Sequence, residues 1–477
     1  MTESTRTPPS PALLERFAAI VGPRHVVTEP DAMRPYLVEW RDLYEGVSPM
    51  VLRPGSTAEV AAILALASET GTAVVPQGGN TGLVGAQVPD RSGAEIVLSL
   101  GRLDRIRAVD PASDTLVAEA GVVLERVQAA AEAADRLFPL SLGSQGSCTI
   151  GGNLSTNAGG TGVLAYGNAK DLVLGLEVVL PTGEVLDGLR ALRKDNAGYD
   201  MKGLFLGTEG TLGVITAAVL KLFAKPKAQE VAVVGVEAPE AALSLLALAK
   251  GRAGTQLTAF EAMPRMLVDF ALRHLPGTRD PLPSAPPWYL LVEVSVGTTD
   301  AEARALMETI LEDGLTAGLV LDATIAGSLA QARDFWRLRH GLSEVQKYEG
   351  GSIKHDVSVP LAAVPAFIAE AEAAVGALVP GCRPVPFGHL GDGNIHFNVS
   401  QPVGGDKAAF LARWDEMNAV VHGIATRMGG SIAAEHGVGR LKRDLLPGVR
   451  SPVEIALMRR LKATLDPAGI LNPGRVI

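Results

Sequence analysis

The sequence predicts an α+β protein of two or three domains, and three observations support this prediction. The chain has 477 residues, more than one hydrophobic core normally serves. Its N-terminal part contains a β-α-β unit followed by glycine-rich loops and further strands. After Ala224-Lys-Pro-Lys227, where charge and proline increase, the pattern starts again with a helix and a strand, so a domain boundary is expected there.

Composition narrows the class of protein. Hydrophobic residues make up 47% of the chain, and the formal net charge of −9 argues against nucleic acid or an anionic membrane surface as a partner. The cysteines Cys148 and Cys382 are too few for a disulfide framework and indicate a reducing compartment. The first residues lack the apolar stretch of a secretory signal, and no long uncharged apolar run predicts an integral membrane segment. We therefore expect a cytoplasmic protein.

The expected elements follow from hydrophobic periodicity and capping residues. A helix is predicted over Pro11–Val21 and a short strand over Pro49–Leu52. Ser56 and Glu59 form a capping-box pattern that begins the next helix, and the strand Thr72–Val75 follows it. The later elements are a hairpin over 173–180 and 184–187, a helix over 240–250, a strand over 288–296, and helices near 408–428 and 451–465.

Three glycine-rich blocks distinguish the N-terminal part. The first, Pro76–Leu83, offers many backbone N–H groups and little side chain, which makes it a natural cradle for phosphate. The second, Leu142–Gly160, has six glycines, and the third, Leu206–Ile215, runs into a strand. The G-x-G-x-x-A match at Gly160–Ala165 follows a loop rather than a strand, so the usual dinucleotide fingerprint is rejected. Three blocks in one α+β region imply a single extended polar ligand.

Four polar residues in the C-terminal part indicate a second kind of chemistry. In Phe387–Asn398 a Gly-Asp-Gly element separates His389 from His396, so the chain can bend and bring both imidazoles to one point. Glu435 and His436 follow among glycines. Two imidazoles and one carboxylate with open positions are a recurring ligand set for a first-row metal that binds substrate oxygens. The sequence therefore predicts metal ligands at His389, His396 and Glu435, with His436 left for proton transfer.

These motifs occur together, in this order, in one family. From about Pro49 to its end the chain resembles the FAD-linked D-2-hydroxyacid dehydrogenases of the vanillyl-alcohol oxidase type. Within this family it is most similar to the D-2-hydroxyglutarate dehydrogenases. The motifs that carry the resemblance are Pro76–Leu83, Gly143–Gly160, Arg193–Asp200, Gly207–Ile215, His389–Asn398, Glu435–His436 and Asn472–Gly474.

The resemblance implies a fold and a cofactor. It implies a two-subdomain FAD-binding domain over 1–224, an inserted cap domain with an antiparallel sheet and helices over 225–430, and a C-terminal helical segment over 431–477 that completes the FAD domain. FAD is expected to bind without a covalent bond, since Asn80 stands where covalent relatives carry a histidine. The residues implied at FAD are Pro76, Gly78, Gly79, Asn80, Thr81, Gly82 and Leu83 at the pyrophosphate, Gly146, Ser147, Ile150, Gly151, Gly152, Thr156 and Asn157 along the ribityl chain and ring, Gly210, Val214 and Ile215 at the adenine end, and Asn472 at the isoalloxazine.

The resemblance also implies catalytic roles. A zinc or manganese ion held by His389, His396 and Glu435 would bind the 2-hydroxyl and carboxylate oxygens of a D-2-hydroxyacid and lower the pKa of the alcohol. His436 would accept the hydroxyl proton while the C2 hydride passes to flavin N5. Asn398 would hydrogen-bond the substrate carboxylate.

Three further residues are implied at the far end of the substrate. Arg339 and Ser343 lie one helical turn apart, and Lys354 begins the neighbouring strand, so all three are expected to converge on a distal carboxylate. This predicts D-2-hydroxyglutarate or D-malate as the substrate, with 2-oxoglutarate or oxaloacetate as the product.

Several alternatives stay open. A D-lactate or glycolate dehydrogenase of the same family has a substrate without a distal carboxylate, so it would not need Lys354. A metal-dependent hydrolase would use the same histidines and glutamate with a bound water, which leaves the three glycine blocks unexplained. A flavin-binding protein without catalysis leaves the proton acceptor and the metal ligands without a role. No motif identifies the oligomeric state or the electron acceptor, for which an electron-transfer flavoprotein, a quinone and oxygen are candidates.

Overall fold

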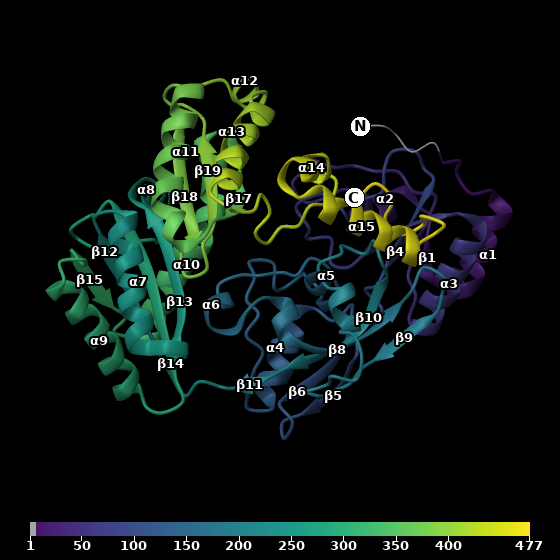
Figure 1. Ribbon diagram of the computed structural model, residues 1–477, viewed down its shortest axis with the longest axis horizontal. Helices are drawn as coiled ribbons and strands as arrows, with labels where there is room; N and C mark the ends of the chain where they lie inside the picture. The colour runs from purple at the N-terminus through teal and green to yellow at the C-terminus, as the bar shows by residue number, and fades with distance from the viewer. Residues whose placement is uncertain (1–5) are drawn as a thin grey trace. The chain divides into compact units, whose positions relative to one another are not determined.

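The computed structural model describes residues 6–477, which form two compact units (Figure 1). The first unit comprises the residues up to 159, together with 167–225 and 435–477, and the second comprises 160–166 and 226–434. The sequence placed domain boundaries after residues 224 and 430. The compact units divide instead at 225/226 and 434/435, and the short segment 160–166 belongs to the second unit although its neighbours on both sides belong to the first.

The first unit begins with a small sheet in the strand order β1-β2-β4-β3, in which the last three strands are parallel. Helix α3 connects β2 to β3, and the Ser56 hydroxyl caps it by accepting the Glu59 N–H. The Glu59 carboxylate accepts the Gly55 N–H rather than that of Ser56, so the predicted capping box is only half formed. The elements here are α1 (Pro11–Val21), η1 (Pro23–His25), β1 (Val26–Val27), α2 (Pro30–Leu37), β2 (Val51–Leu52), α3 (Thr57–Thr70), β3 (Ala73–Gln77) and β4 (Glu95–Ser99).

A second, antiparallel sheet of the first unit has the order β5-β6-β10-β8-β9. The predicted hairpin is confirmed as β8 and β9, and the second glycine block contains the short helix α5. The elements are β5 (Ile106–Asp110), β6 (Thr115–Glu119), α4 (Leu124–Ala133), β7 (Arg136–Leu137), α5 (Ile150–Ser155), η2 (Ala169–Leu172), β8 (Val173–Val179), β9 (Val185–Gly188), η3 (Met201–Leu204), β10 (Val214–Lys221) and β11 (Phe223–Ala224).

The C-terminal segment returns to the small sheet of the first unit. Leu471 forms a parallel bridge to Val74, and both side chains lie in the same apolar core. Arg475 makes a buried ion pair with Glu95 on β4. The segment contains η7 (Arg443–Leu445), α14 (Leu446–Val449) and α15 (Pro452–Leu465), and the predicted C-terminal helix is thereby confirmed.

The second unit is built on a sheet in the order β15-β12-β14-β13-β18-β19-β16, with β17 also paired to β19, and every pairing is antiparallel. The predicted helix near 408–428 is divided into α12 and α13, because Asp406 caps a first short helix and a second one starts after Arg413. The elements are α6 (Val163–Tyr166), β12 (Ala228–Val236), α7 (Pro239–Ala253), η4 (Gly254–Gln256), β13 (Leu257–Pro264), α8 (Arg265–His274), β14 (Trp288–Val296), α9 (Asp300–Thr316), β15 (Asp322–Ile325), α10 (Leu329–Val345), η5 (Gln346–Glu349), β16 (Ser352–Ile353), β17 (Asp356–Ser358), η6 (Leu361–Ala363), α11 (Val364–Leu378), β18 (Arg383–His389), β19 (Asn394–Ser400), α12 (Lys407–Leu411) and α13 (Trp414–Arg427).

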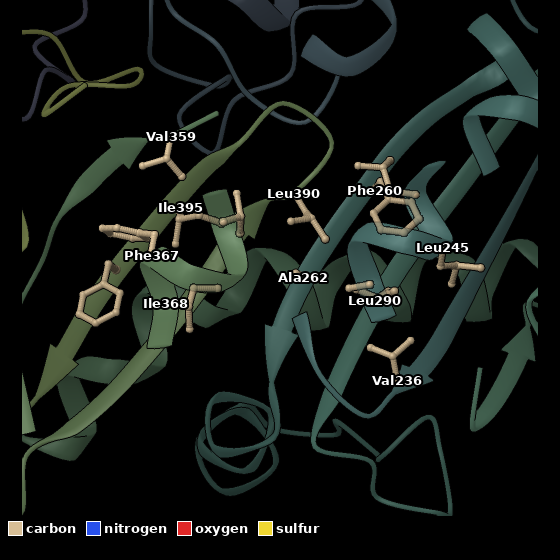
Figure 2. Packing of buried hydrophobic residues seen from close by; sticks show 14 of the residues in the cluster. Val236, Leu245, Phe260, Ala262, Leu290, Val359, Phe367, Ile368, Leu390 and Ile395 are labelled. Carbon is tan, nitrogen blue, oxygen red and sulfur yellow. The ribbon is translucent and has the colours of Figure 1, made fainter. Parts of the chain in front are cut away.

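Apolar side chains project from both faces of this sheet. On one face they pack against α7, α9, α11 and α13, and Figure 2 shows part of this core, with Phe260 and Leu290 on strands and Leu245 and Phe367 on helices. On the other face a smaller core packs under α8 and α10. Alternation along each strand therefore decides which helices a side chain meets.

The stretch Leu361–Leu378, which includes α11, is long and apolar enough by length and composition to cross a membrane, with 33% of it buried. Its inward side chains, among them Phe367, Ala371 and Val375, pack in the larger core of the sheet. A core helix of a folded domain passes the same test of length and composition, so this stretch is weak evidence for a membrane span.

The segment 160–166 is a short excursion that carries α6. It begins at Gly160 and is followed by Gly167, both with positive φ, and the chain rejoins itself where Ala169 N donates to Ala158 O at 2.9 Å. Within the second unit α6 packs against β13. Leu164 fits against Gly391, where an added Cβ would lie 2.9 Å from a Leu164 methyl group.

Candidate active site

The first two glycine blocks approach each other with almost no side chain between them. A Cβ added at Gly78 would lie 2.4 Å from Thr149 Oγ1, and one added at Gly79 would lie 2.0 Å from Ser147 O. Neither position tolerates a side chain, so backbone lines both sides of this part of the unit. This arrangement suits close contact with a long polar ligand.

Four buried polar side-chain atoms in or next to these blocks have no hydrogen-bond partner among the described residues. They are Asn80 Oδ1, Thr149 Oγ1, Asn153 Nδ2 and Asn472 Oδ1. Buried hydroxyl and amide groups are normally paired, so unpaired ones beside a backbone cradle fit a polar group of a cofactor. The sequence had singled out Asn472 but not Thr149, whose signal was its position at the start of α5.

Asn80 is held by its side chain as well as by the loop. Its Nδ2 donates to Pro35 O and Val38 O, each at 2.8 Å, and its φ is +53°. The side chain is therefore engaged with the segment around α2. In the third block Gly210 lies against Pro76, since an added Cβ would be 3.2 Å from its ring, and Val214 and Ile215 are buried in β10.

In the second unit the two predicted imidazoles lie on the two strands of one hairpin. His389 ends β18, and His396 lies on β19 opposite Phe387. The ring centroids are 5.5 Å apart and nearly perpendicular. The bend that the Gly-Asp-Gly element predicted is confirmed. Both side chains leave the sheet on the face that α8 and α10 cover, because Phe387 belongs to that core and alternate residues share a face.

A buried glutamate on the next strand holds His389. Ala262 pairs with Gly388 across β13 and β18, so Glu261 stands opposite His389. Glu261 Oε1 lies 2.8 Å from His389 Nδ1, and Oε2 lies 2.9 Å from Arg339 Nε and 2.7 Å from its Nη2. Burial opposes ionisation of Glu261, but His389 and Arg339 outweigh it and lower its pKa to about 2. Glu261 was not predicted as a site residue from the sequence, although a lone carboxylate in the apolar strand Leu257–Pro264 was a signal.

Asp356 stands in the same relation to His396. The two residues are paired across β17 and β19, and Asp356 Oδ1 lies 3.7 Å from His396 Nδ1. The same oxygen accepts Asn394 Nδ2 at 3.0 Å, and Asp356 is 2% exposed. The sequence analysis did not select Asp356.

The three residues expected at a distal carboxylate are brought together only in part. Lys354 lies between β16 and β17, and its Nζ donates to Ser343 O at 3.0 Å and to Ser343 Oγ at 3.4 Å. Arg339, one turn earlier on α10, is directed to Glu261 and stacks over Phe387. Asn398 is buried on the same face as His396, where its Nδ2 donates to Gln346 Oε1 at 3.1 Å.

Glu435 and His436 are the first residues of the C-terminal part of the first unit. Glu435 Oε1 lies 3.9 Å from His436 Nε2. The glycines that follow, Gly437 and Gly439, both have positive φ, and the amides of Val438 and Gly439 donate to the carboxylate of Glu209. Burial outweighs these bonds and the positive charge of Lys442, and it raises the pKa of Glu209 to about 7.

Comparison with known proteins places these features in a family context. Residues 48–188 match the family described as FAD binding domain, and residues 225–476 match the C-terminal domain of FAD linked oxidases. A protein of Oryza sativa subsp. indica named probable D-2-hydroxyglutarate dehydrogenase, mitochondrial, is 40% identical over 97% of this chain and 81% of its own length. The D-2-hydroxyglutarate dehydrogenase of Xanthomonas citri pv. viticola is 39% identical over 94% of this chain and 93% of its own length.

Solved structures resemble the fold as a whole. A p-cresol methylhydroxylase matches with a TM-score of 0.77 at 16% identity, over 98% of this chain and 96% of its own. An alkyldihydroxyacetonephosphate synthase matches with a TM-score of 0.75 at 18% identity, over 98% of this chain and 87% of its own. At these identities the likeness concerns the fold alone.

Proposed function

The chain belongs to the FAD-linked oxidase family and is an FAD-dependent D-2-hydroxyacid dehydrogenase that acts on a CH–OH group, and from this premise we propose that it oxidises D-2-hydroxyglutarate to 2-oxoglutarate with the help of a divalent metal ion. Several of the relatives carry the name of this activity. D-malate, one carbon shorter, is the second candidate substrate.

One observation favours the metal ion above the others, namely the bond between Glu261 and His389. A histidine that binds a metal through one ring nitrogen usually donates the other N–H to a carboxylate, which fixes the tautomer and orients the ring. Glu261 at 2.8 Å from His389 Nδ1 fits this role and leaves Nε2 as the nitrogen with the lone pair. We propose zinc or manganese ligands at His389, His396 and Glu435.

Chain continuity is consistent with this ligand set. In the second unit the backbone N–H of Ala434 donates to Asp356 O at 3.4 Å, and Ser431 bridges to Ser358 on the same strand. Asp356 is the cross-strand partner of His396. Glu435 directly follows Ala434 in the chain. It is therefore one residue away from the backbone hydrogen bond to Asp356, the cross-strand partner of His396.

The residues of the chain then have separate tasks in the oxidation. The glycine cradle would hold FAD, which would supply an acceptor for the C2 hydride of the substrate. His389, His396 and Glu435 would hold a metal ion, which would supply a Lewis acid for the hydroxyl oxygen. His436 accepts the hydroxyl proton at an imidazole nitrogen.

The distal carboxylate of the substrate is proposed to meet Lys354 and Ser343. Arg339 already faces the carboxylate of Glu261, so its charge is compensated within the protein. Lys354 Nζ donates to the backbone carbonyl oxygen and the hydroxyl of Ser343, and an ammonium at this position can also donate to a substrate carboxylate. We therefore propose that Lys354 is the main residue that selects a dicarboxylate substrate and that Arg339 supports it. D-lactate and glycolate lack the group that would require this lysine.

The electron acceptor is proposed to be an electron-transfer flavoprotein or a quinone. A cytoplasmic location remains a proposal from composition, and several relatives carry the word mitochondrial in their names.

Anaerobic flavin reduction tests the proposed function directly. The purified yellow protein is mixed with D-2-hydroxyglutarate, D-malate, D-lactate or glycolate, and the loss of flavin absorbance is followed in time. We expect D-2-hydroxyglutarate to reduce the flavin fastest and a chelator to stop the reduction while the flavin stays bound. A preference for D-lactate or glycolate would contradict the dicarboxylate assignment, and full activity of protein shown to be free of metal would contradict the metal.

A further inference from the structure

A buried carboxylate lies directly behind the loop that carries His436. Glu209 Oε1 accepts the N–H of Val438 at 2.7 Å, and Oε2 accepts the N–H of Gly439 at 2.9 Å. Two successive backbone N–H groups that converge on one anion form a small nest. The carboxylate therefore holds the chain at the second and third residues after His436.

The loop has no freedom to move toward this carboxylate. A Cβ added at Gly437, whose φ is +85°, would lie 2.8 Å from Glu209 Oε1. On its other side the loop is fixed by Val84 O, which accepts the N–H groups of Arg440 at 2.9 Å and Leu441 at 3.2 Å. The residues after His436 are thus held from two directions.

Glu209 is itself firmly anchored to the cofactor region. Its φ is +52°, a conformation that costs free energy in a residue with a side chain and persists only when its surroundings fix it. Its N–H donates to Ser155 O at 2.8 Å, and its carbonyl accepts Asn472 Nδ2 at 2.7 Å. Ser155 belongs to α5 of the second glycine block, so this block, the carboxylate and the His436 loop form one hydrogen-bonded chain.

We propose that Glu209 is a positioning residue, which fixes the loop after His436 so that the imidazole stays at the place where the substrate hydroxyl loses its proton. The proposal rests on the proposed function, in which His436 accepts that proton. A misplacement of about 1 Å can slow a reaction by about 100-fold, so a clamp of this kind matters for the rate even though it touches no substrate.

The substitution Glu209→Gln tests the clamp with little change of shape. It places an NH₂ group against one of the two N–H donors, which turns an attraction into a repulsion. We expect flavin reduction by D-2-hydroxyglutarate to slow by about 10- to 100-fold, with the flavin content and KM unchanged. Hydrogen–deuterium exchange of the peptide 436–441 should become faster. The matched control is Glu119→Gln, a buried glutamate on β6 that binds Arg105 and Arg107, and it should change neither measurement.

A double variant separates a positioning role from a general structural one. If Glu209 acts through His436, then Glu209→Gln combined with His436→Ala should be no slower than His436→Ala alone. Additive losses, or a normal rate in Glu209→Gln, would overturn the proposal. If Glu209→Gln does not fold, Gly437→Ala presses a methyl group against the same oxygen, and the same loss of kcat at constant KM is expected.

The proposed function can fail separately. A normal rate of flavin reduction in His436→Ala would remove His436 as the proton acceptor and the reason for the clamp. Faster exchange of the peptide 436–441 in Glu209→Gln, together with a normal rate in that variant, would leave the oxidation intact and overturn only the positioning role.

Discussion

Two glutamates, one in each unit, are buried almost equally, but their pKa values are shifted in opposite directions. Glu261 is 1% exposed and Glu209 is 6% exposed. Burial alone would raise the pKa of both carboxyls. At Glu261 the interactions with His389 and Arg339 outweigh burial and the pKa falls to about 2, whereas at Glu209 two backbone N–H groups and Lys442 do not, and the pKa rises to about 7. Of these two buried carboxyls, the one in direct contact with an imidazole and a guanidinium stays ionised at neutral pH.

Glu261 therefore carries a fixed negative charge in the second unit, whereas the charge of Glu209 in the first unit varies with pH. Glu261 is ionised throughout the range in which enzymes work, which suits a residue that orients an imidazole. Glu209 changes its protonation near neutral pH, because its partners are mostly dipoles.

The largest effect is expected when the imidazole beside Glu261 is removed. His389→Ala should lower turnover by roughly 10³-fold or more, since a metal ion contributes several kcal/mol to such reactions. The flavin should stay bound, because its cradle lies in the other unit. Absorbance spectra measure the flavin, and elemental analysis measures the metal. The control His422→Ala removes another buried imidazole of the same unit and should keep the metal content.

Removal of the Glu261 charge should destabilise the second unit. Glu261→Gln leaves Arg339 buried without its anion, so the free energy of unfolding should fall by about 3–5 kcal/mol. Urea unfolding followed by fluorescence measures the change. The control Glu69→Gln breaks an exposed pair with Arg16 and should have a far smaller effect. A small loss in both variants would mean that water or a rearranged side chain compensates Arg339.

The pH dependence of stability should show Glu209 directly. Its pKa rises from 4.5 to about 7 on folding, so the folded protein binds the proton more tightly than the unfolded chain. The resulting stability is fully present below pH 4.5 and is lost as the pH rises through 7, by at most about 3 kcal/mol. Glu209→Gln should remove this part of the pH profile. Identical profiles for the variant and the parent protein, measured by thermal unfolding between pH 4.5 and 8, would contradict the raised pKa.

The smallest effect is expected at Lys354, whose ammonium lies beside Ser343. Lys354→Ala should slow the oxidation of D-2-hydroxyglutarate by about 30-fold, or about 2 kcal/mol, and affect D-lactate far less. The matched control is Arg337→Ala on α10, whose guanidinium donates to Pro276 O and Gly277 O at the surface. Equal losses on both substrates would remove Lys354 from the choice of substrate.

The parts of the molecule that were predicted from the sequence depend on local information. The helix Pro11–Val21, the hairpin of β8 and β9 and the bend between His389 and His396 follow from capping, alternation and glycine within a few residues. Local signals also gave the glycine blocks, whose lack of side chains the structure explains by the close approach of Gly79 to Ser147.

The residues that were missed have partners far away in the sequence. Glu261 meets His389 across 128 residues, and Glu209 meets Val438 across 229. In each case the acidic residue could be noticed in its own stretch, but its partner could not be identified from the sequence because it lies in a distant part of the chain. Arg339 shows the same limit, since helical spacing placed it near Ser343 but could not show that Glu261 on β13 would draw its guanidinium away.

The excursion that carries α6 has a consequence for synthesis on the ribosome. α6 ends at Tyr166 and β13, on which it packs, begins at Leu257, so 90 residues lie between them in the order of translation. At 5–20 residues per second, α6 waits roughly 5–18 s before its strand leaves the ribosome. During this interval the apolar core of the second unit, against which Leu164 packs, is incomplete. A nascent chain stalled before Leu257 should therefore be cleaved by protease within 160–167 and become resistant there once β13 has been made.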